Sequence, residues 1–319
     1  MPTASDSPRS RQGAQRVPRE RKPSWLKVPL PGGDGHARLK GLARSRNLHT
    51  VCEEARCPNI GECWSGKHPT MTLMVLGDEC TRRCRFCAVK TVDRAAPPDP
   101  DEPRHVGEAV AAMSVGYVVI TSVDRDDLPD GGAGHYAACV EEIRKASPDT
   151  IVETLIPDYV DEPLATLMEA RPHVLAHNVE VVPRLQRKIR DPRCSFERSE
   201  DTLRQARALA GPGGFTKSSL MVGLGESDDE VTEALERLRA VGVDFLTVGQ
   251  YLRPTTNHAP VKDYVTPERF EQYREQGERL GFAYVASGPL VRSSYKAGEF
   301  FFERMVRERA GDRTDETTA

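Results

Sequence analysis

Three cysteines on one short loop are the residues of this chain best suited to hold a metal cluster. Cys80, Cys84 and Cys87 stand at C-x3-C-x2-C spacing, directly after an apolar run that predicts a strand. Three thiolates on one loop can bind three irons of a cubane and leave the fourth iron open to a small molecule. Structural zinc sites usually pair C-x2-C units or combine cysteine with histidine, so this spacing favours an iron–sulfur cluster over zinc.

A second group of three cysteines lies upstream. Cys52, Cys57 and Cys63 stand at C-x4-C-x5-C spacing, which predicts a second cubane, with a zinc site as the alternative. Six of the eight cysteines fall between positions 52 and 87. Such crowding is typical of metal or cluster binding in a reducing compartment rather than of a disulfide framework. Cys139 and Cys194 have no partner at ligand spacing, so we assign them no role.

Alternating apolar and amphipathic segments predict the fold that positions these loops. The predicted strands are Thr72–Gly77, Tyr117–Ser122, Ile151–Ile156, Val174–Val179, Ser219–Leu224 and Asp244–Tyr251. The predicted helices are His105–Met113, His135–Ala146, Glu162–Ala170, Ser199–Leu209, Asp228–Val241 and Pro267–Leu280. Six such βα units indicate an α/β fold, a partial (β/α)6 barrel with N-terminal and C-terminal extensions, or alternatively a flat doubly wound sheet. Both place ligands at the carboxyl ends of the strands.

Composition and charge exclude several other classes of protein. The 45 Lys and Arg residues nearly balance the 48 Asp and Glu residues, and aromatic residues make up 6%, so we expect no nucleic-acid partner. No apolar run approaches the roughly 20 residues that span a bilayer, so we expect no membrane segment. The N-terminus lacks the apolar core of a secretory signal, which predicts a cytoplasmic location. Its basic, Ser- and Pro-rich composition predicts a disordered arm over residues 1–22.

The segment Val51-Cys-Glu-Glu-Ala-Arg-Cys-Pro-Asn-Ile-Gly-Glu-Cys63, together with the C-x3-C-x2-C loop and Phe86, resembles the lipoyl synthase family of the radical S-adenosylmethionine (SAM) superfamily. The resemblance covers roughly residues 25 to 298. It includes the strand ends and loops Ile120–Gly132, Glu153–Asp158, His177–Glu180, Lys217–Glu226, Gly249–Pro254 and Gly288–Tyr295. It therefore implies a radical-SAM partial barrel over residues 71–281, after an N-terminal extension at 23–70 and before a closing segment at 282–319.

This resemblance implies the insertion of two sulfur atoms, at C6 and C8, into a protein-bound N6-octanoyl-lysine to give lipoyl-lysine. S-adenosylmethionine would bind the open iron of one [4Fe–4S] cluster and be cleaved to a 5′-deoxyadenosyl radical, which can abstract hydrogen from an unactivated carbon. A second, auxiliary [4Fe–4S] cluster would donate the sulfur. The implied catalytic residues are Cys80, Cys84, Cys87 and Ser294, and the implied auxiliary ligands are Cys52, Cys57, Cys63 and Ser294.

The resemblance also implies roles for polar residues at strand ends. Thr121, Ser122, Asn178 and Glu180 are the implied cofactor-binding residues, and ordinary strand-end polar groups are the alternative. For Ser294 the alternative is a helix cap. Two further expectations concern small or charged groups. Gly223–Glu226 forms either a tight turn or a backbone contact to the cofactor. Lys217 and Arg253 either contact acidic patches of the carrier protein or the substrate amide, or are solvated surface charges.

The implied partners are octanoylated lipoyl domains of 2-oxoacid dehydrogenase complexes, the glycine cleavage H protein, and an electron donor such as flavodoxin or ferredoxin. Two other functions compete. A radical sulfur-inserting synthase of the biotin type predicts a different auxiliary ligand set, so the triad that begins at Cys52 argues against it. A zinc-stabilised scaffold or nucleic-acid protein predicts a basic face, which the net charge of −3 argues against.

Overall fold

The computed structural model describes residues 22–28, 32, 34–46, 48–55, 57–65, 71–211, 213–294, 305–306 and 308. The predicted arm over residues 1–22 lies outside the described residues apart from Lys22. Most of residues 295–319 of the closing segment also lie outside the described residues. The disordered arm and the end of the closing segment therefore stay predictions.

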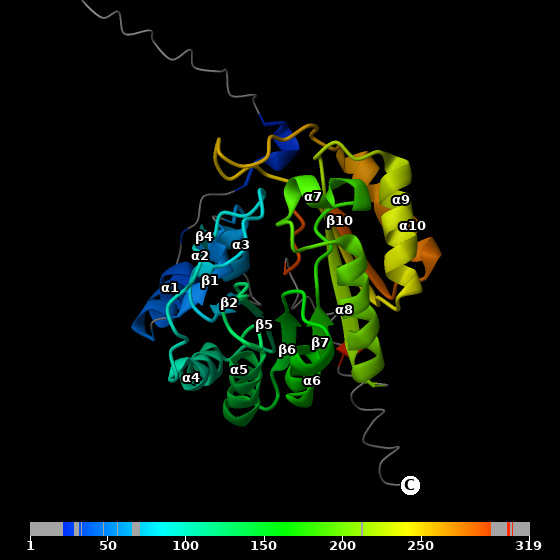
Figure 1. Ribbon diagram of the computed structural model, residues 1–319. Helices are drawn as coiled ribbons and strands as arrows, with labels where there is room; N and C mark the ends of the chain where they lie inside the picture. The colour runs from blue at the N-terminus through cyan, green and yellow to red at the C-terminus, as the bar shows by residue number, and fades with distance from the viewer. Residues whose placement is uncertain are drawn as a thin grey trace, which may run out of the picture.

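Eight of the described strands form one curved sheet in the order β1-β2-β5-β6-β7-β8-β9-β10 (Figure 1). Strand β1 pairs antiparallel with β2, and every other pair is parallel. The strands are His49–Thr50 (β1), Thr72–Val75 (β2), Tyr117–Ser122 (β5), Ile151–Leu155 (β6), Val174–Ala176 (β7), Phe215–Val222 (β8), Phe245–Gln250 (β9) and Tyr284–Gly288 (β10). The prediction of an α/β fold with a parallel sheet is therefore confirmed.

Six helices connect consecutive parallel strands, one in each crossover, and lie on the outside of the sheet (Figure 1). They are Glu102–Met113 (α4), Ala133–Ala146 (α5), Asp161–Glu169 (α6), Phe196–Leu209 (α8), Asp228–Ala240 (α9) and Pro267–Leu280 (α10). This repeat is the predicted run of six βα units. The seventh parallel strand, β10, lies in the segment that we assigned to C-terminal closure.

Two element boundaries differ from the prediction for identifiable reasons. Helix α8 begins at Phe196 rather than Ser199 because the Ser195 hydroxyl accepts a hydrogen bond from the Arg198 amide and caps the helix there. Strand β8 begins at Phe215, four residues before the predicted start at Ser219. Polar residues fill its first half and are nevertheless buried, so a search for apolar runs missed it.

Shorter elements lie at the carboxyl-terminal end of the sheet and in the N-terminal extension. The extension contains Ser24–Leu26 (η1), Asp34–Ser45 (α1), Val51–Glu54 (α2) and Ile60–Ser65 (α3). Strands Glu79–Cys80 (β3) and Lys90–Thr91 (β4) form a separate two-stranded sheet around the C-x3-C-x2-C loop. After β7 come Pro183–Leu185 (η2) and Gln186–Ile189 (α7).

The two faces of the main sheet bury different side chains. On the helix side, alternate strand residues such as Val118 and Ile120 pack with apolar residues of α4 and α5. On the inner side, Tyr117 and Val119 join a cluster contributed by neighbouring strands. In that cluster the rings of Phe215 and Phe245 stack with centroids 4.6 Å apart. Because the helices cover one face, the inner face is left to form an interior, as the barrel prediction requires.

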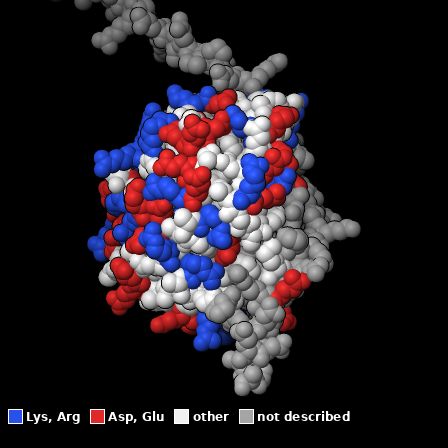
Figure 2. Space-filling model, turned by 90° about the vertical axis from the view of Figure 1, so that its right-hand side faces the viewer, with Lys and Arg blue, Asp and Glu red and all other residues white. Residues whose placement is uncertain are grey.

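The outer surface over α9 and α10 carries charges of both signs (Figure 2). Arg274 of α10 pairs with Glu271 and Glu278 within the same helix, and Arg269 pairs with Asp228 at the start of α9. The described part of this face therefore presents interspersed charges rather than a field of one sign. Among the helices that the structure describes, none is both long and apolar enough to cross a bilayer.

Candidate active site

A cavity of about 510 Å³ opens at the carboxyl ends of the parallel strands. Cysteines from both sequence clusters line it, and Ser294 from the C-terminal segment joins them. The predicted ligand thiols in the lining are Cys52, Cys57, Cys80, Cys84 and Cys87, and Cys194 lines the cavity as well. Cys63 is half-buried on α3 and packs against the adjoining apolar core, outside the lining of this cavity. The fold thus brings five of the six predicted cysteine ligands and Ser294 to one cavity of a size usual for a ligand site.

A rigid turn leads from β2 into the C-x3-C-x2-C loop. Leu76 and Gly77 both have positive φ, 68° and 85°, so the chain reverses directly after the strand. The Leu76 amide donates to the Glu102 carboxylate at 2.8 Å, and its carbonyl accepts from the Arg125 guanidinium at 3.4 Å. Because the backbone groups of this turn are held by buried charged side chains, the loop that begins at Cys80 has a fixed origin.

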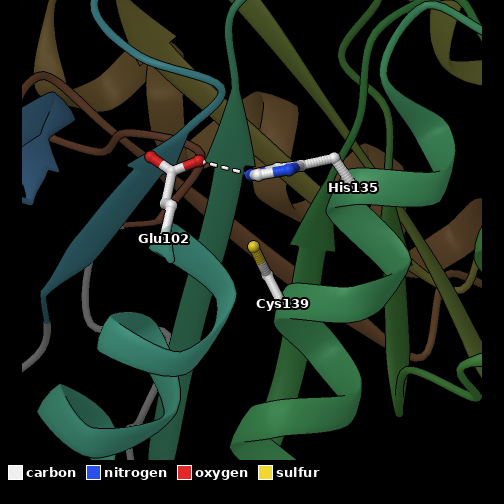
Figure 3. A group of neighbouring side chains, drawn as sticks. All are labelled: Glu102, His135 and Cys139. Atoms are coloured by element: carbon white, nitrogen blue, oxygen red, sulfur yellow. Dashed lines mark hydrogen bonds and ion pairs between the residues drawn. The ribbon is translucent and has the colours of Figure 1, made fainter. Parts of the chain in front are cut away.

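Glu102 belongs to a compact group beneath that turn (Figure 3). Figure 3 shows Glu102 projecting from α4 toward His135 and Cys139 of α5. Their ligand-type atoms lie within 4.8 Å of one another, and His135 Nε2 lies 2.7 Å from the Glu102 carboxylate. The same carboxylate oxygen already accepts from Leu76. The group therefore supports the turn through one oxygen of the Glu102 carboxylate, which lies between the Leu76 amide and the His135 ring.

Burial makes Cys52, Cys80 and Cys87 weaker acids than an exposed thiol. It raises the pKa of Cys80 to about 12 and the pKa of Cys87 to about 11. Burial likewise raises the pKa of Cys52 to about 11. Nearby carboxylates add to the shift at Cys80, whose thiol lies 3.7 Å from Asp124. A thiol loses its proton when it binds a metal ion. These three thiols are therefore neutral without iron and become thiolates when iron binds.

The N-terminal cysteines and the C-terminal segment are joined by hydrogen bonds across more than two hundred residues of sequence. The Asn59 side chain donates to the Leu290 carbonyl at 2.6 Å. The Thr72 hydroxyl donates to the Ser294 hydroxyl at 2.8 Å. These contacts bring Ser294 to the cavity that Cys52 and Cys57 also line.

Arg292 is a site residue to which the sequence analysis assigned no role. Its side chain lines the cavity and donates to the main-chain carbonyls of Gln250 and Val291, at 3.2 and 2.7 Å. Burial lowers the pKa of Arg292, and the neighbouring Cys57 thiol opposes that shift. Its second terminal nitrogen has no hydrogen-bond partner among the described residues. A buried cation with a free donor suits an anionic thiolate cluster beside it.

The four predicted cofactor-binding residues all line the same cavity. Thr121 donates its hydroxyl to the Leu155 carbonyl at 2.9 Å, and Ser122 follows it at the end of β5. The Asn178 amide donates to the Glu180 carboxylate at 3.0 Å, and Glu180 itself has a φ of 65°. Burial raises the pKa of Glu180. The Asn178 carbonyl oxygen is buried without a partner among the described residues, so it can accept a ligand donor.

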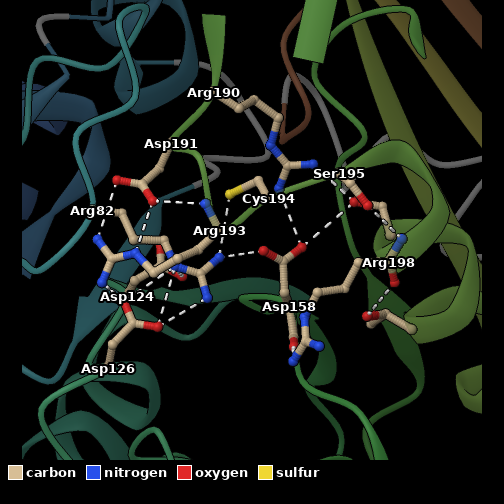
Figure 4. A network of polar contacts seen from close by, with 12 residues as sticks. Arg82, Asp124, Asp126, Asp158, Arg190, Asp191, Arg193, Cys194, Ser195 and Arg198 are labelled. Carbon is tan, nitrogen blue, oxygen red and sulfur yellow. Dashed lines mark hydrogen bonds and ion pairs between the residues drawn. The ribbon is translucent and has the colours of Figure 1, made fainter. Parts of the chain in front are cut away.

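A buried ionic network borders the cavity and was missed by the sequence analysis (Figure 4). The carboxylate of Asp158 pairs with Arg82, with Arg190 at 3.2 Å and with His177 at 3.2 Å. Burial alone would raise the pKa of Asp158, but His177 and the two arginines together lower it well below its usual range. The available signal was position, because Asp158 and His177 both come just after strands of the parallel sheet.

The two cations expected to contact a carrier protein occupy different settings. Lys217 is buried, and its ammonium lies 2.9 Å from both carboxylate oxygens of Glu153. Both expectations for Lys217, a carrier contact and a solvated charge, are therefore wrong, because the side chain of this β8 residue points into the barrel. Arg253 is exposed and donates to the main-chain carbonyls of Thr256 and His258.

In the turn after β8, Gly223 has a φ of 96°, and the Glu226 carboxylate accepts from the Gly223 and Leu224 amides. The hydrogen bonds therefore support the expectation of a tight turn. A cofactor contact at this turn stays a prediction.

Two protein-family models match the chain. A model of the radical SAM superfamily matches residues 74–238, which include the C-x3-C-x2-C loop and the first five parallel strands of the barrel. A model of the N-terminal domain of lipoyl synthase matches residues 4–57. The second match begins well before residue 25, so the family resemblance extends further toward the N-terminus than the motifs indicated.

The chain is also similar over most of its length to known proteins. It is 52% identical to the mitochondrial lipoyl synthase of Sorghum bicolor over 303 residues, which is 93% of this chain and 78% of that protein. It is 53% identical to the chloroplastic lipoyl synthase of Arabidopsis thaliana over 298 residues, which is 92% of this chain and 75% of that protein.

Solved structures with low sequence identity share the fold. Methylornithine synthase (PylB) matches with a TM-score of 0.53 at 11% identity, covering 88% of this chain and 90% of that chain. The hydrogenase maturase HydG from Carboxydothermus hydrogenoformans matches with a TM-score of 0.52 at 13% identity, covering 75% and 66%. These similarities support the arrangement of the barrel and nothing finer.

The expected cytoplasmic location is wrong in the light of these relatives, which are named mitochondrial or chloroplastic lipoyl synthases. That expectation rested on the N-terminal sequence pattern. An Arg- and Ser-containing N-terminus without a secretory core does not distinguish a cytoplasmic start from an organellar targeting segment.

Proposed function

This chain belongs to the lipoyl synthase family of the radical SAM superfamily, and we propose that sulfur insertion takes place in the cavity lined by its two cysteine groups. Membership implies S-adenosylmethionine and a [4Fe–4S] cluster as cofactors. The observation that carries the proposal is the meeting of Cys52 and Cys57 with the C-x3-C-x2-C loop in one space, although the two groups come from separate segments.

Cys80, Cys84 and Cys87 are the proposed ligands of the radical cluster. Their loop leaves the fixed turn after β2, and it is tied to neighbouring segments at both ends. The Arg85 amide donates to the Ile189 carbonyl at 2.8 Å, and His258 Nε2 lies 2.8 Å from the Cys87 carbonyl. A loop anchored in this way would hold a cluster through three thiols that line the cavity, and the open iron would supply the binding site for S-adenosylmethionine.

Cys52, Cys57, Cys63 and Ser294 are the proposed ligands of a second [4Fe–4S] cluster. When bound, the two clusters would supply, respectively, the electron that cleaves S-adenosylmethionine and the sulfur that is inserted. The hydrogen bond from Thr72 supports the role of Ser294, because it fixes the hydroxyl beside the N-terminal cysteines. Cys63 lies on α3, one helix away from the cavity lining, so it is the ligand whose assignment rests most on the family pattern.

Asn178, Glu180, Thr121 and Ser122 are the proposed contacts to S-adenosylmethionine. The half-buried Glu180 carboxylate can accept hydrogen bonds from ribose hydroxyls, and the unpartnered Asn178 carbonyl can accept from an amine. The hydroxyl groups at the end of β5 lie on the same side of the cavity as the thiol of Cys80, which contacts Asp124 just after that strand.

Apolar side chains between the cysteine groups can accommodate an octanoyl chain. The lining includes Val51, Met74, Leu155, Leu220, Met221 and Leu252. Such a surface excludes water and orients a saturated chain without offering an acid or base, which suits hydrogen abstraction by a radical. The proposed macromolecular partners are an octanoylated lipoyl domain or glycine cleavage H protein, and an electron donor such as flavodoxin or ferredoxin.

The experiment that tests this function is anaerobic incubation of the iron-loaded chain with reductant, S-adenosylmethionine and an octanoyl-lysyl peptide, with the products weighed by mass spectrometry. Gain of two sulfur atoms is expected. Cys84→Ala should abolish formation of 5′-deoxyadenosine, whereas Cys57→Ala should retain it and lose the sulfur product. Cys139→Ala is the matched control, because this buried thiol lies outside the cavity lining. Lipoyl product from Cys57→Ala would refute the auxiliary cluster as sulfur donor.

A further inference from the structure

A thiol outside the proposed ligand sets lies against a proposed ligand. Cys194, in the segment after α7, lies beside Cys84 of the C-x3-C-x2-C loop, because Asp191 bonds both residues: its amide donates to the Cys84 sulfur at 3.3 Å and its carbonyl accepts from the Cys194 amide at 2.9 Å. We propose that Cys84 and Cys194 form a disulfide whenever the radical cluster is absent, so that the vacant site is stored in an oxidised form. The inference rests on the proposed function only in taking Cys84 as an iron ligand.

Neighbouring groups hold both sulfurs in place. The Asp191 amide donates to the Cys84 sulfur at 3.3 Å. The Arg82 guanidinium donates to the Cys194 sulfur, also at 3.3 Å, and Figure 4 shows these two side chains. The Cys194 amide in turn bonds the Asp191 carbonyl at 2.9 Å. The loops that carry the two thiols are therefore bound to each other on either side of the sulfur pair, which favours their pairing over pairing with a more distant cysteine.

The pair can be reached by a small oxidant. Cys194 is only 3% exposed, but both Cys84 and Cys194 line the open cavity of about 510 Å³. Cys139 offers a comparison within the same chain, because it is fully buried on α5 and lies outside that lining. A low-molecular-weight disulfide that enters the cavity therefore reaches Cys84 and Cys194 and does not reach Cys139.

The chemistry is thiol–disulfide exchange. One protein thiol attacks the disulfide reagent, breaks its S–S bond and releases one reagent thiol, leaving a mixed disulfide. The second protein thiol then displaces the other half of the reagent. The two protein thiols lose two electrons in total, the reagent gains them, and the two protons pass to the released thiols. Iron bonded to Cys84 blocks the reaction, since that sulfur is then occupied.

The test uses the full chain, freed of iron by chelation under anaerobic conditions and then treated with oxidised glutathione. After the remaining thiols are alkylated, digestion and mass spectrometry should find a Cys84–Cys194 cross-linked peptide as the main disulfide. Cys194→Ser should lose this peptide, and Cys139→Ser should keep it. The oxidised wild type should take up iron and sulfide only after addition of a thiol reductant, and Cys194→Ser treated in the same way should carry glutathione on Cys84 in place of the cross-link.

Two results would overturn the pairing. One is cross-linking of Cys84 mainly to Cys80 or Cys87, and the other is wild-type protein in which Cys84 keeps glutathione and forms no disulfide within the chain. Failure of the proposed function gives a different signature. If iron-loaded protein formed the Cys84–Cys194 disulfide and kept all of its iron, then Cys84 would not be a cluster ligand, and the proposed ligand set would be wrong.

Discussion

The ion pair between Lys217 and Glu153 offers the sharpest test of the barrel interior. Both side chains point inward, one layer below Leu155 and Ser219, which line the cavity. The Glu153 carboxylate is fully buried and also accepts from the Tyr117 hydroxyl at 2.6 Å. Replacing Lys217 with Met keeps the length of the side chain and removes the charge, which leaves a buried carboxylate without its cation.

The expected cost follows from that burial. Removing one member of a buried pair costs about 3–5 kcal/mol, which is a large part of a typical domain stability of about 5–15 kcal/mol. Removing both charges in Glu153→Leu with Lys217→Met should cost less, about 1–3 kcal/mol, because neither charge of the pair is then left buried alone, although the Tyr117 hydroxyl loses the carboxylate that accepts from it. The double variant should therefore be more stable than the single one.

Urea unfolding of the iron-free protein, followed by circular dichroism, measures the change in unfolding free energy of the single and the double variant, provided that unfolding is one cooperative transition. The matched control is Lys145→Met on the surface of α5, where an exposed lysine pairs with Glu142. That change should cost at most about 1 kcal/mol. If Lys217→Met cost no more than the control, or if the double variant were less stable than the single one, the pair would not be buried as described.

Three further predictions test other contacts. Glu102→Ala should destabilise the iron-free protein by about 1–3 kcal/mol in urea unfolding, because the buried Leu76 amide loses its acceptor. Gly249→Ala should lower iron content per chain and expose the C-terminal segment to protease, since a Cβ there would meet the main-chain oxygen of residue 291 at 2.1 Å. The hydrogen bond from Arg184 lowers the pKa of Glu230 to about 2, below the pKa of about 4.3 for a glutamate in the unfolded chain. The ionised Glu230 therefore stabilises the folded state above a pH of about 4.3, and this stabilisation is lost as the pH falls toward 2. Glu230→Gln should therefore flatten the dependence of unfolding free energy on pH in that window.

Much of the fold could be predicted because the βα units repeat and each one leaves a local pattern. All six predicted strands and all six predicted helices occur, and α10 has the predicted bounds. The start of β8 was missed because Thr216, Lys217 and Ser218 are buried polar residues. Inside a barrel, such residues are paired across strands, and a hydropathy pattern contains no information about their partners.

The candidate site was also predictable only where neighbouring residues in the sequence form it. Each cysteine triad was visible because a few consecutive turns of chain supply all three thiols, so sequence spacing reflects spatial spacing. Asp158 and Arg82 come from different loops and meet only because parallel strands end at one edge of the sheet. Cys194 was left without a role for this reason, although its thiol lies against Cys84. In a fold of this kind, a residue that follows a strand should be compared with residues that follow the neighbouring strands before its spacing in sequence is taken as evidence that it stands alone.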